Sequence, residues 1–273
     1  MDYYSELCHF LTAKLLQFNQ PKRGLIALKT AIKNLQTISG NGTLKPNLLT
    51  TVHSDLLQLC LASKNFKYGL ELISNEILDI LKPQNSQFDS KYLISYFYYA
   101  GSIYAAMKQY ESALFYLEQA LTVPASVLSQ IMIESYKKFI LISLINKGKL
   151  PTLPKYTSRI VINQIKPICS IYHELASAFT NFDLDKLNSL VQKYHAILEQ
   201  DKNFGLVKQL QQSFYKKNIQ KLTKTFITLS LADMATKVKL PSAKEAETYM
   251  LNMIKDGEIF ATINQKDGKF NHI

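Results

Sequence analysis

"SAKEAETYMLNMIKDGEIFATINQKDGKF", residues 242–270, changes its hydrophobic period half-way along and decides the fold of the C-terminal part of the chain. Ser242 and Glu245 form a capping box, which predicts the start of a helix. EIFATINQ, residues 258–265, then alternates as a strand does. Asp267-Gly268 is typical of a hairpin turn, after which KFNHI is the expected return strand. The stretch therefore predicts a helix followed by a β-hairpin.

Two further helices are predicted just before this stretch. One spans about 206–227, and Ser230 with Asp233 predicts the start of a second, short helix that Pro241 ends. A helix, a helix-turn-helix and a two-stranded wing together form a winged helix, and the outer strand of the wing leaves an edge open for pairing. Its expected core consists of apolar side chains at helical spacing: Tyr215, Ile219, Leu222, Phe226, Leu231, Met234, Ala235, Val238, Ala246, Tyr249, Met250, Met253 and Ile254.

The preceding part of the chain reads as helical repeats. Residues 91–123 predict two antiparallel helices joined by a short turn at Lys108–Tyr110, with small residues where the helices approach closely. This pattern is close to the tetratricopeptide (TPR) repeat. Looser copies occur at SKNFKYGLELI, NQPKRGLIAL and FTNFDLDKLNSL. The predicted fold is an all-α, TPR-like helical-repeat solenoid over residues 1–203, followed by the winged helix over residues 204–273.

Composition narrows the class of protein. Cys8, Cys60 and Cys169 lie far apart without Cys-x-x-Cys spacing, which favours buried free thiols over a disulfide framework or a zinc site. FILISLI, residues 139–145, is far too short to span a bilayer, and the N-terminus lacks a basic signal region. We therefore expect neither export nor contact with a membrane.

The net charge of +11 raises the question of nucleic-acid binding. Of the 32 basic residues only Arg23 and Arg159 are arginines, whereas readers of bases and phosphates usually rely on the arginine fork. The last predicted helix, residues 242–256, carries three acidic and two basic side chains, which disfavours it as a DNA reader. The helix over 206–227 offers a candidate basic face made of Lys216, Lys217, Lys221 and Lys224. An acidic protein partner or plain solvation fits this face better than RNA.

Catalytic motifs are incomplete. His173-Glu174 begins a His-Glu-x-x-His pattern, but residue 177 is serine, so the second metal ligand is missing. Gly148-Lys149 follows no glycine-rich loop, and Gly-x-Ser-x-Gly is absent from the sequence. We therefore expect a non-enzyme with no catalytic residue, no metal and no cofactor.

A helical-repeat arm fused to a winged helix resembles the PCI module, which scaffold subunits of the proteasome lid, the COP9 signalosome and translation-initiation factor three share. Several segments resemble the subunit-three family of the signalosome, most strongly over about 96–268, whereas residues 1–90 resemble it only in helical pattern. Those segments are ESYKKFILISLI, LPKYTS, YHELA, YKKNIQKLTKTFITLSLADMA and MIKDGEIFATINQKDG. Compared with this family the chain is short at its N-terminal arm, and it ends at Ile273, where members continue into helices that join a bundle.

The resemblance implies a non-catalytic scaffold in a hetero-oligomer in cytoplasm and nucleus. Its expected partners are other PCI subunits of the signalosome and, indirectly, cullin-RING ubiquitin ligases. That complex removes the modifier Nedd8 from cullins, and its zinc chemistry lies in another subunit. PCI subunits associate through winged-helix edges, which gives the following candidate interface: Thr228, Leu229, Ser230, Glu258, Ile259, Phe260, Ala261, Thr262, Ile263, Asn264 and Gln265.

Three alternatives stay open at this stage. Ile259, Ala261 and Ile263 serve either partner choice at the sheet edge or packing of the wing against its helices. The chain could also be a PCI subunit of the proteasome lid or of initiation factor three, which would differ from a signalosome subunit only in its partners. A nucleic-acid-binding winged helix would depend on the four lysines of the basic face and would bind less tightly as salt rises.

Overall fold

The computed structural model describes residues 2–40, 42–75, 77–81, 89–125, 127–150, 152–226, 228–264 and 269–272. The chain divides into two compact units: Met1–Ile142 with Thr152–Cys169, and Ser143–Pro151 with Ser170–Ile273. Within the described residues, no helix is both long and apolar enough to cross a membrane. The expected division at residues 203 and 204 stays a prediction, although a helix does begin at Phe204.

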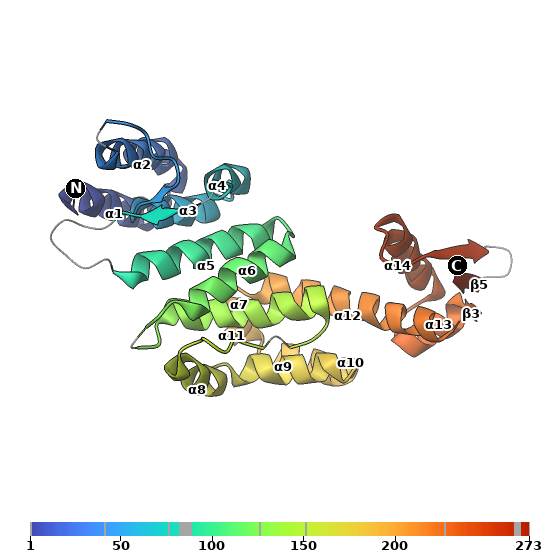
Figure 1. The fold of residues 1–273 in the computed structure, drawn as a ribbon. Helices are drawn as coiled ribbons and strands as arrows, with labels where there is room; N and C mark the ends of the chain where they lie inside the picture. The colour runs from blue at the N-terminus through green and yellow to red at the C-terminus, as the bar shows by residue number, and fades with distance from the viewer. Residues whose placement is uncertain are drawn as a thin grey trace. The chain divides into compact units, whose positions relative to one another are not determined.

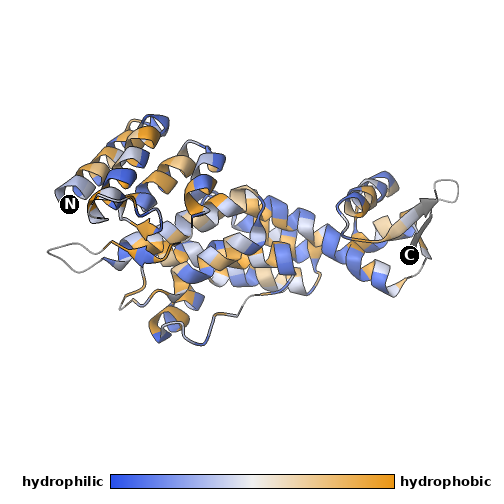
Figure 2. Cartoon of the chain, turned by 45° about the horizontal axis from the view of Figure 1, so that its top comes forward, coloured by the Kyte–Doolittle hydropathy of each residue, from blue (hydrophilic) through white to orange (hydrophobic). Residues whose placement is uncertain are grey.

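The first unit is a stack of paired helices (Figure 1). Hydrophobic and hydrophilic residues alternate along these helices (Figure 2). This pattern is expected of helices that pack against neighbours on one face and contact water on the other. The helices of this unit are α1 (Asp2–Gln17), the 3-10 helix η1 (Pro21–Gly24), α2 (Leu25–Ser39), α3 (Val52–Ala62), α4 (Phe66–Ile73), α5 (Ser90–Ala106), α6 (Tyr110–Thr122), the first part of α7 (Gln130–Lys147) and α8 (Arg159–Ile168).

One turn geometry recurs between successive helices. In the turn from α5 to α6, Lys108 has φ +60°, its N–H bonds to the Ala105 carbonyl at 3.1 Å, and Gln109 N–H bonds to the Tyr104 carbonyl at 3.0 Å. This is the Schellman pattern of helix C-termini. Positive φ with the same two bonds occurs at Asn19, Lys64, Lys108, Phe182, Lys202 and Lys239. The predicted turn at Lys108–Tyr110 and its looser copies are confirmed.

Small residues let the paired helices approach closely, as predicted. A Cβ atom added to Gly101 would lie 2.8 Å from Leu117 Cγ and 3.2 Å from the Ala113 carbonyl oxygen. One added to Gly69 would lie 2.8 Å from Ile103 Cδ1. Glycine at these positions therefore sets the spacing between α5 and α6 and between α4 and α5.

The expectation of an all-helical arm needs one correction. Strands β1 (Leu48–Leu49) and β2 (Asp79–Ile80) form a short parallel pair in the first unit. Leu48 and Leu49 are buried, so their backbone groups need partners within the protein. The side chain of Gln36 provides further partners, because it donates hydrogen bonds to the Pro46 and Leu48 carbonyls at 3.2 and 3.0 Å. The pairing of β1 with β2 joins segments about thirty residues apart, which helical periodicity does not reveal.

Helix α7 begins at Gln130 and ends at Lys147, and Gly148 with φ +70° follows it as a C-cap.

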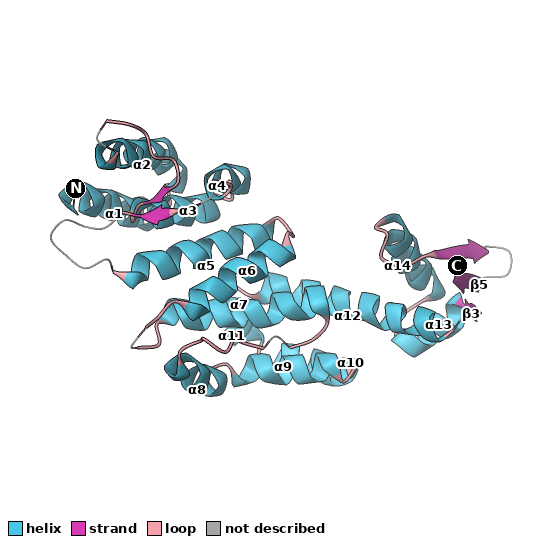
Figure 3. Ribbon diagram, viewed as in Figure 1, coloured by secondary structure: helices cyan, strands magenta, loops and turns pink. Residues whose placement is uncertain are grey.

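The second unit leads into the winged helix. Its helices are the last turns of α7, α9 (Ser170–Thr180), α10 (Leu184–Lys193), α11 (His195–Gln200), α12 (Phe204–Thr225), α13 (Leu231–Val238) and α14 (Ala243–Lys255). Its strands are β3 (Thr228–Ser230), β4 (Ala261–Asn264) and β5 (Lys269–His272), drawn in magenta in Figure 3.

The wing is a three-stranded antiparallel sheet in the order β3-β5-β4, which corrects the expectation of a two-stranded hairpin. Leu229 in β3 pairs with Phe270, and Ile263 in β4 pairs with the same residue from the other side. Strand β4 begins at Ala261, three residues later than expected, and the predicted turn at Asp267-Gly268 lies outside the described residues. The return strand β5 is therefore central.

Candidate functional site

The core of the winged helix takes up part of the predicted interface. Ile259 and Ala261 are 5% and 6% exposed and pack in one cluster with the buried side chains of α13 and α14. The members of that cluster are Ile219, Met234, Ala235, Val238, Leu240, Ala246, Met250, Met253, Ile259 and Ala261. The sequence left two roles open for Ile259 and Ala261, and the structure shows that they pack in the core. There they cover the apolar side chains on the buried face of α14.

Phe260, between them, and Thr262, after them, face the other way. Phe260 is 70% exposed, and Thr262 is exposed as well. Strand β4 pairs only with β5 among the described residues, so it forms an edge of the sheet. Ile263 and Asn264 belong to β4, and Gln265 lies outside the described residues. The β4 edge, defined here as residues 260–264, therefore combines unpaired backbone groups with an exposed aromatic side chain.

Strand β3 forms the opposite edge and has structural tasks of its own. Ser230 Oγ accepts a hydrogen bond from Asp233 N–H at 3.0 Å and caps α13, as the capping box predicted. Leu229 packs against the core, while Thr228 is exposed. Thr228 is thus the member of this predicted segment whose side chain is most open to solvent.

Glu258 forms an ion pair at the base of the wing. Lys216 Nζ on α12 lies 2.9 Å from Glu258 Oε1 and 3.5 Å from Asp256 Oδ2. Partial burial alone would lower the pKa of Lys216, but the hydrogen bonds and charges of Glu258 and Asp256 outweigh it and raise the pKa. The charge of this lysine is therefore used within the unit, to hold the start of the wing against α12.

The four lysines of the predicted basic face do not form one open row. Lys217 is half-buried and donates to the Asn146 carbonyl at 3.0 Å, next to the bond from Ser213 Oγ to the Ile145 carbonyl at 2.9 Å. Burial lowers the pKa of Lys217. Lys217 thus caps the C-terminus of α7, which corrects its expected place on an open basic face. Lys221 lies over the Phe182 ring at 4.5 Å, and Lys224 is exposed.

Two family models match the chain. The first describes the N-terminal helical repeats of COP9 signalosome complex subunit 3 and covers residues 1–161; the second describes the PCI domain and covers residues 191–271. The chain is also 42% identical over 279 residues to COP9 signalosome complex subunit 3 of Drosophila melanogaster, in an alignment that covers 97% of this chain and 61% of that protein.

The chain belongs to the COP9 signalosome subunit 3 family.

The corresponding protein of Dictyostelium discoideum is also 42% identical, over 264 residues that cover 97% of this chain and 62% of the relative. The chain thus spans about three-fifths of the length of these subunit 3 relatives. Because the subunit 3 repeat model begins at residue 1, the expectation that residues 1–90 share only a helical pattern with the family is wrong. The PCI match contains α12, α13, α14, β3 and β4, and β5 as far as residue 271.

Helix α14 of this subunit 3 chain has an outward face that is open to solvent. The exposed residues on it are Lys244, Thr248, Leu251, Asn252 and Lys255. Leu251 is 50% exposed, which places an apolar side chain on the face that a DNA reader would present to base edges. Together with the acidic residues of α14, this exposed leucine makes the face a poor match for a phosphate backbone.

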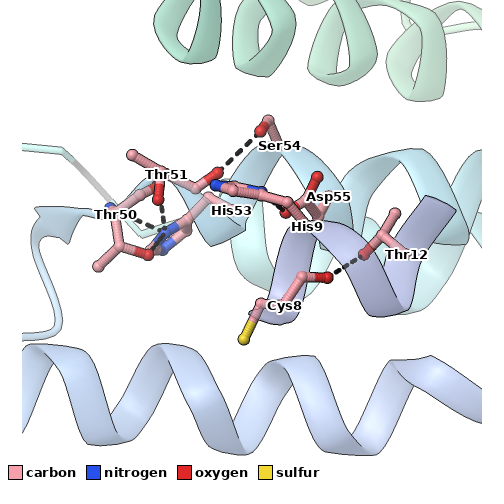
Figure 4. A network of polar contacts seen from close by, with 8 residues as sticks. All are labelled: Cys8, His9, Thr12, Thr50, Thr51, His53, Ser54 and Asp55. Carbon is pink, nitrogen blue, oxygen red and sulfur yellow. Dashed lines mark hydrogen bonds and ion pairs between the residues drawn. The ribbon is translucent and has the colours of Figure 1, made fainter. Parts of the chain in front are cut away.

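A polar network in the first unit was not foreseen from the sequence (Figure 4). His9 on α1 forms a short contact with Asp55 on α3 and stacks on Tyr92, with ring centroids 4.7 Å apart. His53 is 5% exposed, and its Nδ1 accepts from Thr50 N–H at 3.0 Å, while burial lowers its pKa to about 4. The sequence carries no signal for the contact between His9 and Asp55, because these residues lie 46 positions apart.

The thiol of Cys8 in this network is not activated as a nucleophile. The Cys8 sulfur points away from His9 and Asp55 (Figure 4), and burial together with the charge of Asp55 raises the pKa of the Cys8 thiol. Cys8, Cys60 and Cys169 are all buried, as predicted, and none of the three is in a disulfide. Within the described ranges, His, Cys, Asp and Glu side chains nowhere gather in a group of three that could hold a metal ion. The network therefore ties α1 to α3.

Proposed function

We propose that this chain acts as a non-catalytic scaffold of the COP9 signalosome and joins other PCI subunits through the edges of its winged-helix sheet. The observation that carries the proposal is the β4 edge in a chain of the subunit 3 family: Ile259 and Ala261 enter the core, while Phe260 between them is 70% exposed.

The chemistry of the edge supports strand-to-strand association. Backbone N–H and C=O groups of an edge strand supply affinity, and alternate side chains supply choice of partner. Since Ile259 and Ala261 serve the core, the described side chains that remain for choice of partner are Phe260 and Thr262 on the β4 edge, with Thr228 on the opposite edge. Strand β3 and the β4 edge lie on either side of β5, so one sheet offers two surfaces.

The wider role follows the resemblance to the PCI family. The complex would remove Nedd8 from cullins, with the zinc chemistry in another subunit, and this chain would contribute assembly in cytoplasm and nucleus. The match to the subunit 3 repeat model favours signalosome partners over those of the proteasome lid or of initiation factor three. The nucleic-acid alternative is weakened because Lys216 and Lys217 are engaged within the unit.

Affinity purification of the tagged chain from its own cells tests the proposal. The lysate is kept at physiological salt and divided into nuclease-treated and untreated halves, and the recovered proteins are identified by mass spectrometry. We expect other signalosome PCI subunits in both halves, together with cullin-deneddylating activity. Recovery of none of these subunits, or of partners that disappear with nuclease, would overturn the scaffold role.

A further inference from the structure

The first unit contains a hollow of about 700 Å³ that the scaffold role does not use. Strand β2 and the end of α4 form one side of it, and α5 and α6 form the other. Its volume lies within the range of about 300–1,000 Å³ that is typical of ligand sites.

Aromatic side chains form the wall that α5 and α6 provide. The rings of Tyr104 and Tyr116 are stacked with centroids 5.3 Å apart, and Phe97 lies 6.3 Å from Tyr116. Burial raises the pKa of Tyr116 to about 12, so its hydroxyl stays neutral at physiological pH. Rings that pack on one another in this way lose little freedom when a ligand arrives.

The mouth of the hollow is apolar and open to solvent. Leu78 is 75% exposed and Phe115 is 57% exposed, and both line the hollow. Large side chains this exposed on two sides of one hollow are typical of a surface that a ligand or a partner covers.

A single carboxylate accompanies these rings. Among the described residues that line the hollow, Asp79 is the one with a charged side chain. Its Oδ1 accepts a hydrogen bond from Ile80 N–H at 2.8 Å, which fixes the carboxylate on β2. Aromatic faces and a carboxylate both attract cations, and the planar guanidinium of arginine can stack on the first while it pairs with the second.

We propose that this hollow binds a segment of a partner protein that carries an arginine next to a large apolar side chain. The apolar side chain of the partner packs against the aromatic wall of the hollow, and the guanidinium of its arginine pairs with Asp79. The inference rests on the first unit alone and does not depend on the signalosome assignment.

The protein contains no tryptophan, so a tryptophan-bearing peptide reports its own binding by fluorescence. The probe is acetyl-Gly-Arg-Trp-Leu-Arg-Gly-amide, titrated with the full chain, and acetyl-Gly-Glu-Trp-Leu-Glu-Gly-amide is the charge-reversed control. We expect a saturable blue shift for the basic peptide and at least about tenfold weaker binding of the acidic one.

Two variants locate the peptide on the hollow. Asp79→Asn keeps an oxygen for Ile80 N–H but loses the charge, and Phe115→Ser removes an exposed ring. Each is expected to weaken binding of the basic peptide about fivefold. Asp185→Asn makes the same change of charge in the other unit and should bind like the wild type.

Three results would overturn the inference: equal affinity for both peptides, unchanged affinity in both hollow variants, or no binding at millimolar peptide. Equal affinity would instead assign the hollow to an uncharged apolar ligand.

Discussion

Lys216 Nζ on α12 lies 2.9 Å from Glu258 Oε1, which joins a helix to the residue that leads into the wing across 42 positions of sequence. The contact shows how the winged helix is held: the side chains of Ser230 and Ser242 cap the starts of α13 and α14, and a partly buried charge pair fixes the base of the hairpin. Strand β4 is thereby anchored at one end, while its outer edge stays available.

Breaking this pair should cost little stability. Lys216→Met is expected to lower the free energy of unfolding by no more than about 1 kcal/mol, because both partners remain in contact with solvent. Since the pKa of Lys216 is raised, its contribution is present below the ordinary value of 10.5 and is lost as pH rises through the raised value. Urea unfolding of Lys216→Met, Glu258→Gln and the double variant gives the coupling; a coupling above about 3 kcal/mol would contradict this account.

Neighbouring residues of the wing should behave in opposite ways. Ile259→Ala is expected to destabilise the chain by about 2–4 kcal/mol, because it empties part of the core. Phe260→Ala should change the free energy of unfolding by less than about 0.5 kcal/mol, because its ring is exposed. Equal losses in urea unfolding would show that the assigned directions of these side chains are wrong.

Glycine at a close helix approach should be irreplaceable even by alanine. Gly101→Ala places a methyl group 2.8 Å from Leu117 Cγ and is expected to cost about 1–3 kcal/mol. Gly205→Ala is the matched control: apart from its chain neighbours and the backbone of its own helix, no atom lies within 4 Å of the added carbon, and alanine favours α12 by up to about 1 kcal/mol. Thermal melts compare the two, and a Gly101→Ala variant as stable as the control would refute the tight contact between α5 and α6.

His53 should make stability depend on pH. Burial lowers its pKa from 6.5 to about 4, so between these values the unfolded chain binds a proton that the folded chain does not. The free energy of unfolding is expected to fall by roughly 3 kcal/mol as pH drops from 6.5 to 4, and the effect of this group fades as pH rises above 6.5. His53→Gln should lose this part of the pH dependence, and identical profiles for wild type and variant would contradict the buried neutral ring.

Features that depend on neighbouring residues could be predicted from the sequence. The capping boxes at Ser230 and Ser242 and the turn at Lys108 are local, because each is closed by atoms within a few positions. The apolar stripes of the winged helix were predicted for the same reason, since helical spacing alone places their side chains on one face.

Features that depend on distant contacts could not be predicted. From the sequence alone Lys217 was expected to face solvent. In the structure its ammonium group donates to the end of α7, 71 positions away. Alternation places Ile259 and Phe260 on opposite faces but does not say which face meets α14. The pairing of β3 with β5, which makes the wing three-stranded, likewise joins segments about forty positions apart.

The central claim, that the β4 edge joins PCI subunits, is tested most directly by quantitative co-purification with an edge variant. Phe260→Ser with Thr262→Lys puts a charge on the edge and removes its exposed ring, and both side chains are exposed in the wild type. The matched control, Leu251→Ser with Thr248→Lys, makes similar changes on the outward face of α14. We predict that wild type and control recover the same amounts of signalosome PCI subunits and that the edge variant recovers at least about tenfold less. Undiminished recovery by the edge variant would contradict the account.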